Sequence, residues 1–176
     1  MAVACVAARV HFHVGAQMSP PRGCNVRGCT VADRLSLHRA EATRVAAIEA
    51  LFASVNPSIL QASDLQHALT RSLDVVASMP DRSLGVRRAL YPSMGKMFGR
   101  IKETGVEVPR FDLSSLRALL FSADAEVEAV RLLRADAVVA AAKALPWLVQ
   151  EVRSELEKWT AGETSKPVLD RLAGAA

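Results

Sequence analysis

Aromatic residues and glycine are both scarce in this sequence. Phe, Trp and Tyr together make up 5% of the 176 residues, and there are only nine glycines. The apolar share of 51% consists mostly of Ala, Leu and Val, a composition typical of helices. No segment alternates convincingly between apolar and polar residues, so we expect essentially no sheet. The sequence therefore predicts an all-α protein, an irregular helical bundle of about five to seven helices.

Cysteine is absent from most of the chain. Cys5, Cys24 and Cys29 are the only three, and none follows position 29. A chain of this length can bury roughly 70% of its unfolded surface and does not need disulfides to fold. Three is also an odd number, and the spacing fits no extracellular disulfide framework. We therefore expect an intracellular, reducing compartment.

Membrane-spanning and catalytic signatures are also missing. No uncharged apolar run approaches the roughly 20 residues that cross a bilayer. There is no nucleophile elbow, phosphate-binding loop, dinucleotide fingerprint or His-Glu-x-x-His zinc motif. We assign no catalytic residue, no cofactor and no metal, and an enzyme without a recognisable motif remains one alternative. Zinc is a weaker hypothesis, for which the candidate ligands are His11, His13, Cys24 and Cys29.

The first 32 residues contain no Asp or Glu, in contrast to the rest of the chain. They carry Arg9, Arg22 and Arg27 and end in a Pro- and Gly-rich stretch. Such a segment is typical of a flexible tail. It is also explained if translation truly starts at Met18 and the residues before it are not part of the protein. An alternative is an organelle transit peptide, because import favours positive, acid-poor segments. We treat residues 1–32 as a basic tail or targeting segment.

Helical periodicity predicts one domain over 33–162. Its elements include a first helix that ends near Val55 and a central, most buried helix from about Asp124 to Leu145. Arg134 falls on the apolar side of that central helix, so it must reach solvent or find a carboxylate. Pro92 is expected to break the helical phase of 84–102. Residues 103–111 are predicted to be a linker and candidate hinge, and 163–176 a C-terminal tail.

Two segments are candidates for an internal duplication. Residues 58–73 and 130–145 share four identities, which are Leu60/Leu132, Asp64/Asp136, Ala68/Ala140 and Leu73/Leu145. Chance is the alternative explanation, since the chain is rich in Ala and Leu.

A basic block lies between positions 82 and 102. It contains six cations and no acid, namely Arg82, Arg87, Arg88, Lys96, Arg100 and Lys102. Such residues, with Tyr91 and Phe98 among them, suit contact with nucleic acid or with an acidic partner. A solvated face explains them equally well.

Three large side chains are candidates for a surface that binds another protein. They are Met94, Met97 and Trp147, of which Trp147 points away from the inward stripe of the last helix. The alternative for Trp147 is packing under the 103–111 linker. Our leading hypothesis is a non-enzymatic protein-interaction module, an accessory or scaffold subunit of a larger assembly. The second is a nucleic-acid-associated protein that uses the 82–102 block.

Overall fold

The computed structural model describes residues 31–79, 83–122 and 126–175, with side chains described from residue 40 onward. These residues form eight α-helices and no strand, so the all-α class is confirmed with more helices than expected. The helices are α1 (Val31–Ser54), α2 (Ala62–Ala77), α3 (Leu84–Thr104), α4 (Ser114–Leu120), α5 (Glu128–Ala144), α6 (Leu148–Glu151), α7 (Arg153–Gly162) and α8 (Lys166–Leu172). A short 3-10 turn, Ala173–Ala175, follows α8. The predictions for residues 1–30, including the zinc ligands and the targeting segment, lie outside the described residues.

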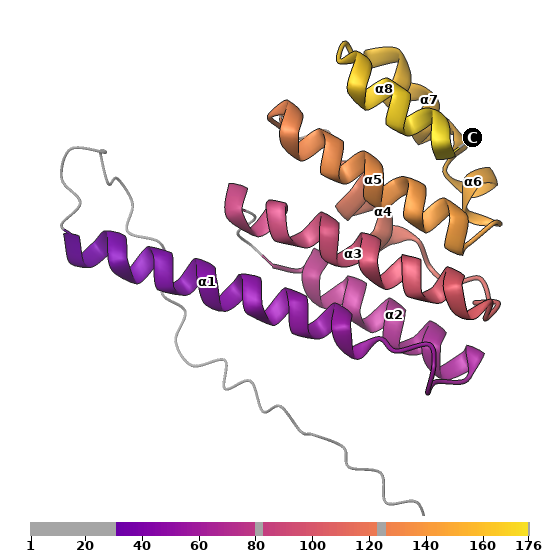
Figure 1. Ribbon diagram of the computed structural model, residues 1–176, viewed down its shortest axis with the longest axis horizontal. Helices are drawn as coiled ribbons and strands as arrows, with labels where there is room; N and C mark the ends of the chain where they lie inside the picture. The colour runs from indigo at the N-terminus through magenta and orange to yellow at the C-terminus, as the bar shows by residue number, and fades with distance from the viewer. Residues whose placement is uncertain (1–30, 80–82, 123–125, 176) are drawn as a thin grey trace, which may run out of the picture.

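The helices are arranged in two layers. The first layer contains α1, α3, α5 and α8, each packed against the next, and Figure 1 shows α1, α3 and α5 running side by side in the same direction. The second layer includes α2, which packs against α4, and then α6 and α7. The chain thus forms successive helical hairpins stacked in order, which is a more regular arrangement than the expected irregular bundle.

The C-terminal residues belong to this stack. Residues 163–176 were expected to be a tail, but they contain α8, which packs against α5. Val168 and Leu172 are buried there, because α8 takes the next position in the first layer. The prediction of a C-terminal tail is therefore corrected. The apolar residues of this segment form a helix because a neighbouring helix covers them.

Helix α3 is continuous through Pro92, contrary to the expected break. Proline removes one backbone hydrogen bond from the helix. Buried side chains of the same stripe lie on both sides of it, Leu90 and Tyr91 before and Met94 and Phe98 after. Packing of this stripe against α1 and α5 outweighs the lost bond. The helix ends instead at Gly105, whose φ of 66° is the left-handed conformation that glycine adopts at helix ends.

Helix α5 is the central element, as predicted. Val130, Ala137 and Ala141 are fully buried, and the small alanines allow close packing against α3. Val127 precedes the helix and is 54% exposed. Residues 106–113 connect α3 to α4 without helical structure, and their role as a hinge stays a prediction.

Candidate functional site

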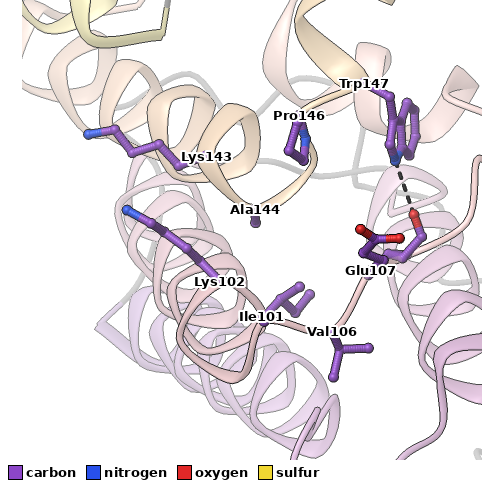
Figure 2. A pocket seen from close by; sticks show the side chains of 10 residues that line it. Ile101, Lys102, Val106, Glu107, Lys143, Ala144, Pro146 and Trp147 are labelled. Carbon is purple, nitrogen blue, oxygen red and sulfur yellow. Dashed lines mark hydrogen bonds between the residues drawn. The ribbon is translucent and has the colours of Figure 1, made fainter.

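A groove of about 430 Å³ lies where α3 and α5 end. Figure 2 shows it between the last turns of these helices and the connections that follow them. The residues that line it are Ile101, Lys102, Gly105, Val106, Glu107, Val108, Lys143, Ala144, Pro146 and Trp147. We call this hollow the α3–α5 groove. Its wall combines apolar surface with two cations and one carboxylate.

Trp147 forms one fixed wall of the groove. Its indole Nε1–H donates a hydrogen bond to the carbonyl oxygen of Val108 at 3.0 Å, drawn as the dashed line in Figure 2. The ring also meets Phe111 edge to face, with ring centroids 5.4 Å apart. These contacts confirm the alternative that Trp147 packs against the 103–111 linker. The ring stays half-buried, so part of it is available to a ligand in the groove.

Lys102 and Lys143 supply the positive charge of the groove. They occupy the last turns of α3 and α5, and both side chains are exposed. Figure 2 shows them pointing the same way, on the opposite side of the hollow from Glu107. No carboxylate of the described residues forms an ion pair with either lysine. The two ammonium groups therefore face solvent together.

The opposite end of the same helix pair contains a buried charge network. The Glu126 carboxylate, whose side chain is 1% exposed, accepts a hydrogen bond from the Tyr91 hydroxyl at 2.9 Å. It also pairs with Arg87 at 3.4 Å and with Arg134 at 3.2 Å. The Arg134 guanidinium lies 4.2 Å from the ring centre of Trp159. Of the two alternatives expected for Arg134, which were to reach solvent or to find a carboxylate, the structure shows the second.

The environment of Tyr91 keeps its hydroxyl group protonated. Burial raises the pKa of Tyr91 far above its ordinary value, and the neighbouring Glu126 carboxylate raises it further. The phenol therefore stays a hydrogen-bond donor at physiological pH.

A larger hollow of about 710 Å³ borders this network, but ion pairs occupy many of its charges. Arg131 binds Glu163 through two nitrogens, at 2.9 and 3.2 Å, and donates a further hydrogen bond to the Glu126 carbonyl oxygen. Glu155 pairs with Arg117 at 2.9 Å. Because these groups hold helices and connections together, we assign them to the fold.

The structure distributes the basic block among different environments. Arg87 pairs with Glu126, while Arg100 donates hydrogen bonds to the carbonyl oxygens of Phe52 and Val55 at the end of α1. Lys102 lies in the α3–α5 groove. The other two described cations, Arg88 and Lys96, are exposed on α3, and Arg82 lies outside the described residues.

The two methionines of the expected partner surface lie in the core. Met94 and Met97 are both 0% exposed, so their place on that surface is corrected. The physical reason is that α3 packs against α1 on one side and α5 on the other, which leaves its apolar stripe covered. Of the three residues, only Trp147 lines a groove. Lys143 was not singled out from the sequence, because nothing local to it shows that α5 ends beside α3.

A two-layer stack of helical hairpins, in which each hairpin packs against the next, is the architecture of helical repeat proteins. The family comparison agrees with this class and spans all of the described residues. Residues 31–176 match the family described as ECM29, C-terminal ARM-like repeats, and the chain belongs to this family. No curated protein and no solved structure matches it.

Among the described residues, no helix is long and apolar enough to cross a membrane. The same residues contain no cluster of three or more His, Cys, Asp or Glu side chains arranged to hold a metal ion.

Proposed function

We propose that this protein is a non-enzymatic scaffold module that binds another protein as an accessory subunit of a larger assembly. The observation that carries the proposal is the stack of ARM-like repeats over residues 31–176. Stacked repeats create extended surfaces, and such surfaces serve mainly in protein binding. The α3–α5 groove supports the proposal, because it has a fixed aromatic wall on one side and, on the other, two lysines that form no ion pair with the described acids.

A nucleic-acid partner is the second candidate. It is favoured by the exposed cations Arg88, Lys96 and Lys102, all of which lie on α3. Phosphate contacts by such residues would give an affinity that falls steeply as salt increases. Two other members of the basic block, Arg87 and Arg100, already bind groups within the protein, which reduces the charge available for this role.

The two candidates are separated by affinity purification of the full tagged chain from its source, with and without nuclease. Mass spectrometry identifies the proteins recovered, and each is then expressed and mixed with the purified chain for size-exclusion chromatography. We expect at least one protein that survives nuclease and coelutes with the chain in a fixed ratio. Loss of every partner after nuclease treatment, with direct binding to a random oligonucleotide, would support the second candidate.

A further inference from the structure

We propose that the α3–α5 groove binds an acidic, hydrophobic peptide segment of the partner protein, with carboxylates on Lys102 and Lys143 and an apolar side chain against Trp147. This inference rests on the proposed scaffold function and specifies the chemistry of the partner. It is argued from the charge, the shape and the fixed geometry of the groove.

The charge of the groove selects an anionic ligand. Lys102 and Lys143 each present an ammonium with three hydrogen-bond donors, and no described carboxylate forms an ion pair with either. Glu107, the single acid among the lining residues, lies across the hollow. Two neighbouring exposed cations repel each other and attract a ligand that carries adjacent carboxylates.

The apolar part of the groove selects a hydrophobic side chain next to those carboxylates. Ile101 forms a buried part of the wall, while Val106 and Trp147 are half-buried and Pro146 is exposed. A volume of about 430 Å³ accommodates a side chain such as leucine or phenylalanine together with its backbone. A partly exposed apolar wall in the same groove as two lysines therefore favours a ligand that is both acidic and hydrophobic.

The geometry of Trp147 is fixed before any ligand binds. The hydrogen bond to the Val108 carbonyl and the edge-to-face contact with Phe111 both restrain the indole. A wall that is already ordered loses little conformational entropy when a peptide packs on it. Because Trp147 Nε1–H already donates its hydrogen bond to Val108, the ring offers a ligand only its apolar face. The lysines provide the polar recognition.

The basic N-terminal segment of this chain does not have the chemistry of the occupant. Residues 1–32 contain no Asp or Glu, so they offer no side-chain carboxylate to the two lysines. An acidic segment of a partner protein is the complementary ligand. This is the occupant to which the proposal commits.

The first test uses short dye-labelled Gly/Ser peptides and the full chain. One peptide carries two glutamates followed by leucine and phenylalanine, a second has glutamines in place of the glutamates, and a third has the leucine and phenylalanine replaced by serine. Fluorescence anisotropy should show binding of the first peptide and weakening by about tenfold or more for each of the other two. Equal affinity for all three peptides, or no binding of the first, overturns the proposal.

The position of binding is measured at the same time by NMR. The chain has two tryptophans, so the two indole N–H signals of a ¹⁵N-labelled sample are assigned with a Trp159→Phe variant. The acidic peptide should shift the Trp147 indole signal, while the signal of Trp159, which packs on Arg134, stays in place. A shift at Trp159 alone places the peptide elsewhere and overturns the proposal.

Charge variants connect binding to the two lysines. Lys102→Glu/Lys143→Glu should abolish peptide binding, and the neutral pair Lys102→Gln/Lys143→Gln should weaken it by about tenfold or more. The matched control is Arg88→Glu/Lys96→Glu, which changes the net charge equally at two exposed positions of α3 outside the groove. Circular dichroism melting verifies that each variant folds. Equal weakening by the control would show a nonspecific charge effect and overturn the proposal.

Failure of this inference and failure of the scaffold function give different results. If a purified partner coelutes equally well with the Lys102→Gln/Lys143→Gln variant, the scaffold function stands and the groove proposal is wrong. If the acidic peptide binds the groove but no protein partner survives nuclease, the scaffold function fails, and only the peptide specificity of the groove stands.

Discussion

The two ends of the α3–α5 pair use charge in opposite ways. At the end where the helices begin, Glu126 is buried and contacts Arg87, Tyr91 and Arg134. At the end where they finish, Lys102 and Lys143 are exposed and form no ion pair with the described acids. The same helix pair therefore has an electrostatically satisfied end and an electrostatically open end.

The difference indicates which charges hold the fold together and which are available to a partner. A buried charge without a partner costs several kcal/mol, so the groups around Glu126 must satisfy one another inside the protein. Exposed charges contribute little to stability, since water solvates them. Substitutions at the satisfied end should thus change mainly folding stability, whereas charge substitutions at the open end should change mainly binding.

The largest expected effect is the removal of the Glu126 carboxylate. Glu126→Ala leaves the buried Arg134 without its carboxylate partner and should lower the free energy of unfolding by about 3–5 kcal/mol. Glu126→Gln keeps an acceptor for the Tyr91 hydroxyl and should cost less. Urea denaturation followed by circular dichroism measures both values. A loss below about 1 kcal/mol for the alanine variant would show that the network does not stabilise this end.

A somewhat smaller loss is expected in the middle of α3. Met97→Ala removes a fully buried side chain and should cost about 3 kcal/mol, because the transfer of the lost atoms and the resulting cavity both destabilise the core. Lys96→Ala, at the exposed neighbouring position, is the control and should change stability by less than about 0.5 kcal/mol. Similar losses for the two variants would mean that Met97 does not pack as a core residue.

Features that depend on local pattern could be predicted from the sequence. The end of the first helix, the buried central helix and the need of Arg134 for a carboxylate all follow from apolar periodicity within one segment. The apolar stripe of α3 can also be recognised within its own segment, but its burial on both sides depends on distant helices. Met94 and Met97 looked available to a partner because the sequence does not show that α1 and α5 both cover α3.

The repeat itself was hidden by unequal spacing. First-layer helices start at Val31, Leu84, Glu128 and Lys166, so successive helices of this layer begin 53, 44 and 38 residues apart. A fixed-period comparison fails on such a chain. The pairing of 58–73 with 130–145 aligns α2, a second-layer helix, with α5 of the first layer. It does not correspond to the structural repeat.

The groove could not be predicted from the sequence, because its residues come together only in the folded stack. Its two lysines come from helices whose ends meet only in the folded stack, and Trp147 reaches Val108 across 39 positions. The sequence indicated that Trp147 either packs on the linker or meets a partner. The structure shows the first contact and leaves the exposed part of the ring for the second.

Acid should weaken the satisfied end. Burial alone would raise the pKa of Glu163, but hydrogen bonds from the Ser165 N–H, Arg131 and Trp159 outweigh it and hold the pKa below its usual 4.5. Since the folded state favours the ionised carboxylate, this stabilisation is complete above the pKa of the unfolded chain and is lost as pH falls below it.

Glu163→Gln should therefore lower the free energy of unfolding at pH 7 by about 1–2 kcal/mol. It should also reduce the stability that is lost between about pH 5 and pH 3, the range in which carboxylates ordinarily titrate. Glu157→Gln, at an exposed position of α7, serves as the control. Urea titrations at a series of pH values measure the difference. An unchanged pH dependence in Glu163→Gln would contradict the prediction.

The smallest change in stability is expected at the open end. Lys102→Gln/Lys143→Gln removes two exposed charges from the last turns of α3 and α5, where each interacts favourably with the helix dipole. The free energy of unfolding should therefore fall by less than about 1 kcal/mol in total, measured by urea denaturation. A loss as large as that of Glu126→Ala would mean that the lysines also hold the fold together. The contrast between the two ends would then disappear, and weaker partner binding by the lysine variants would no longer identify a binding site.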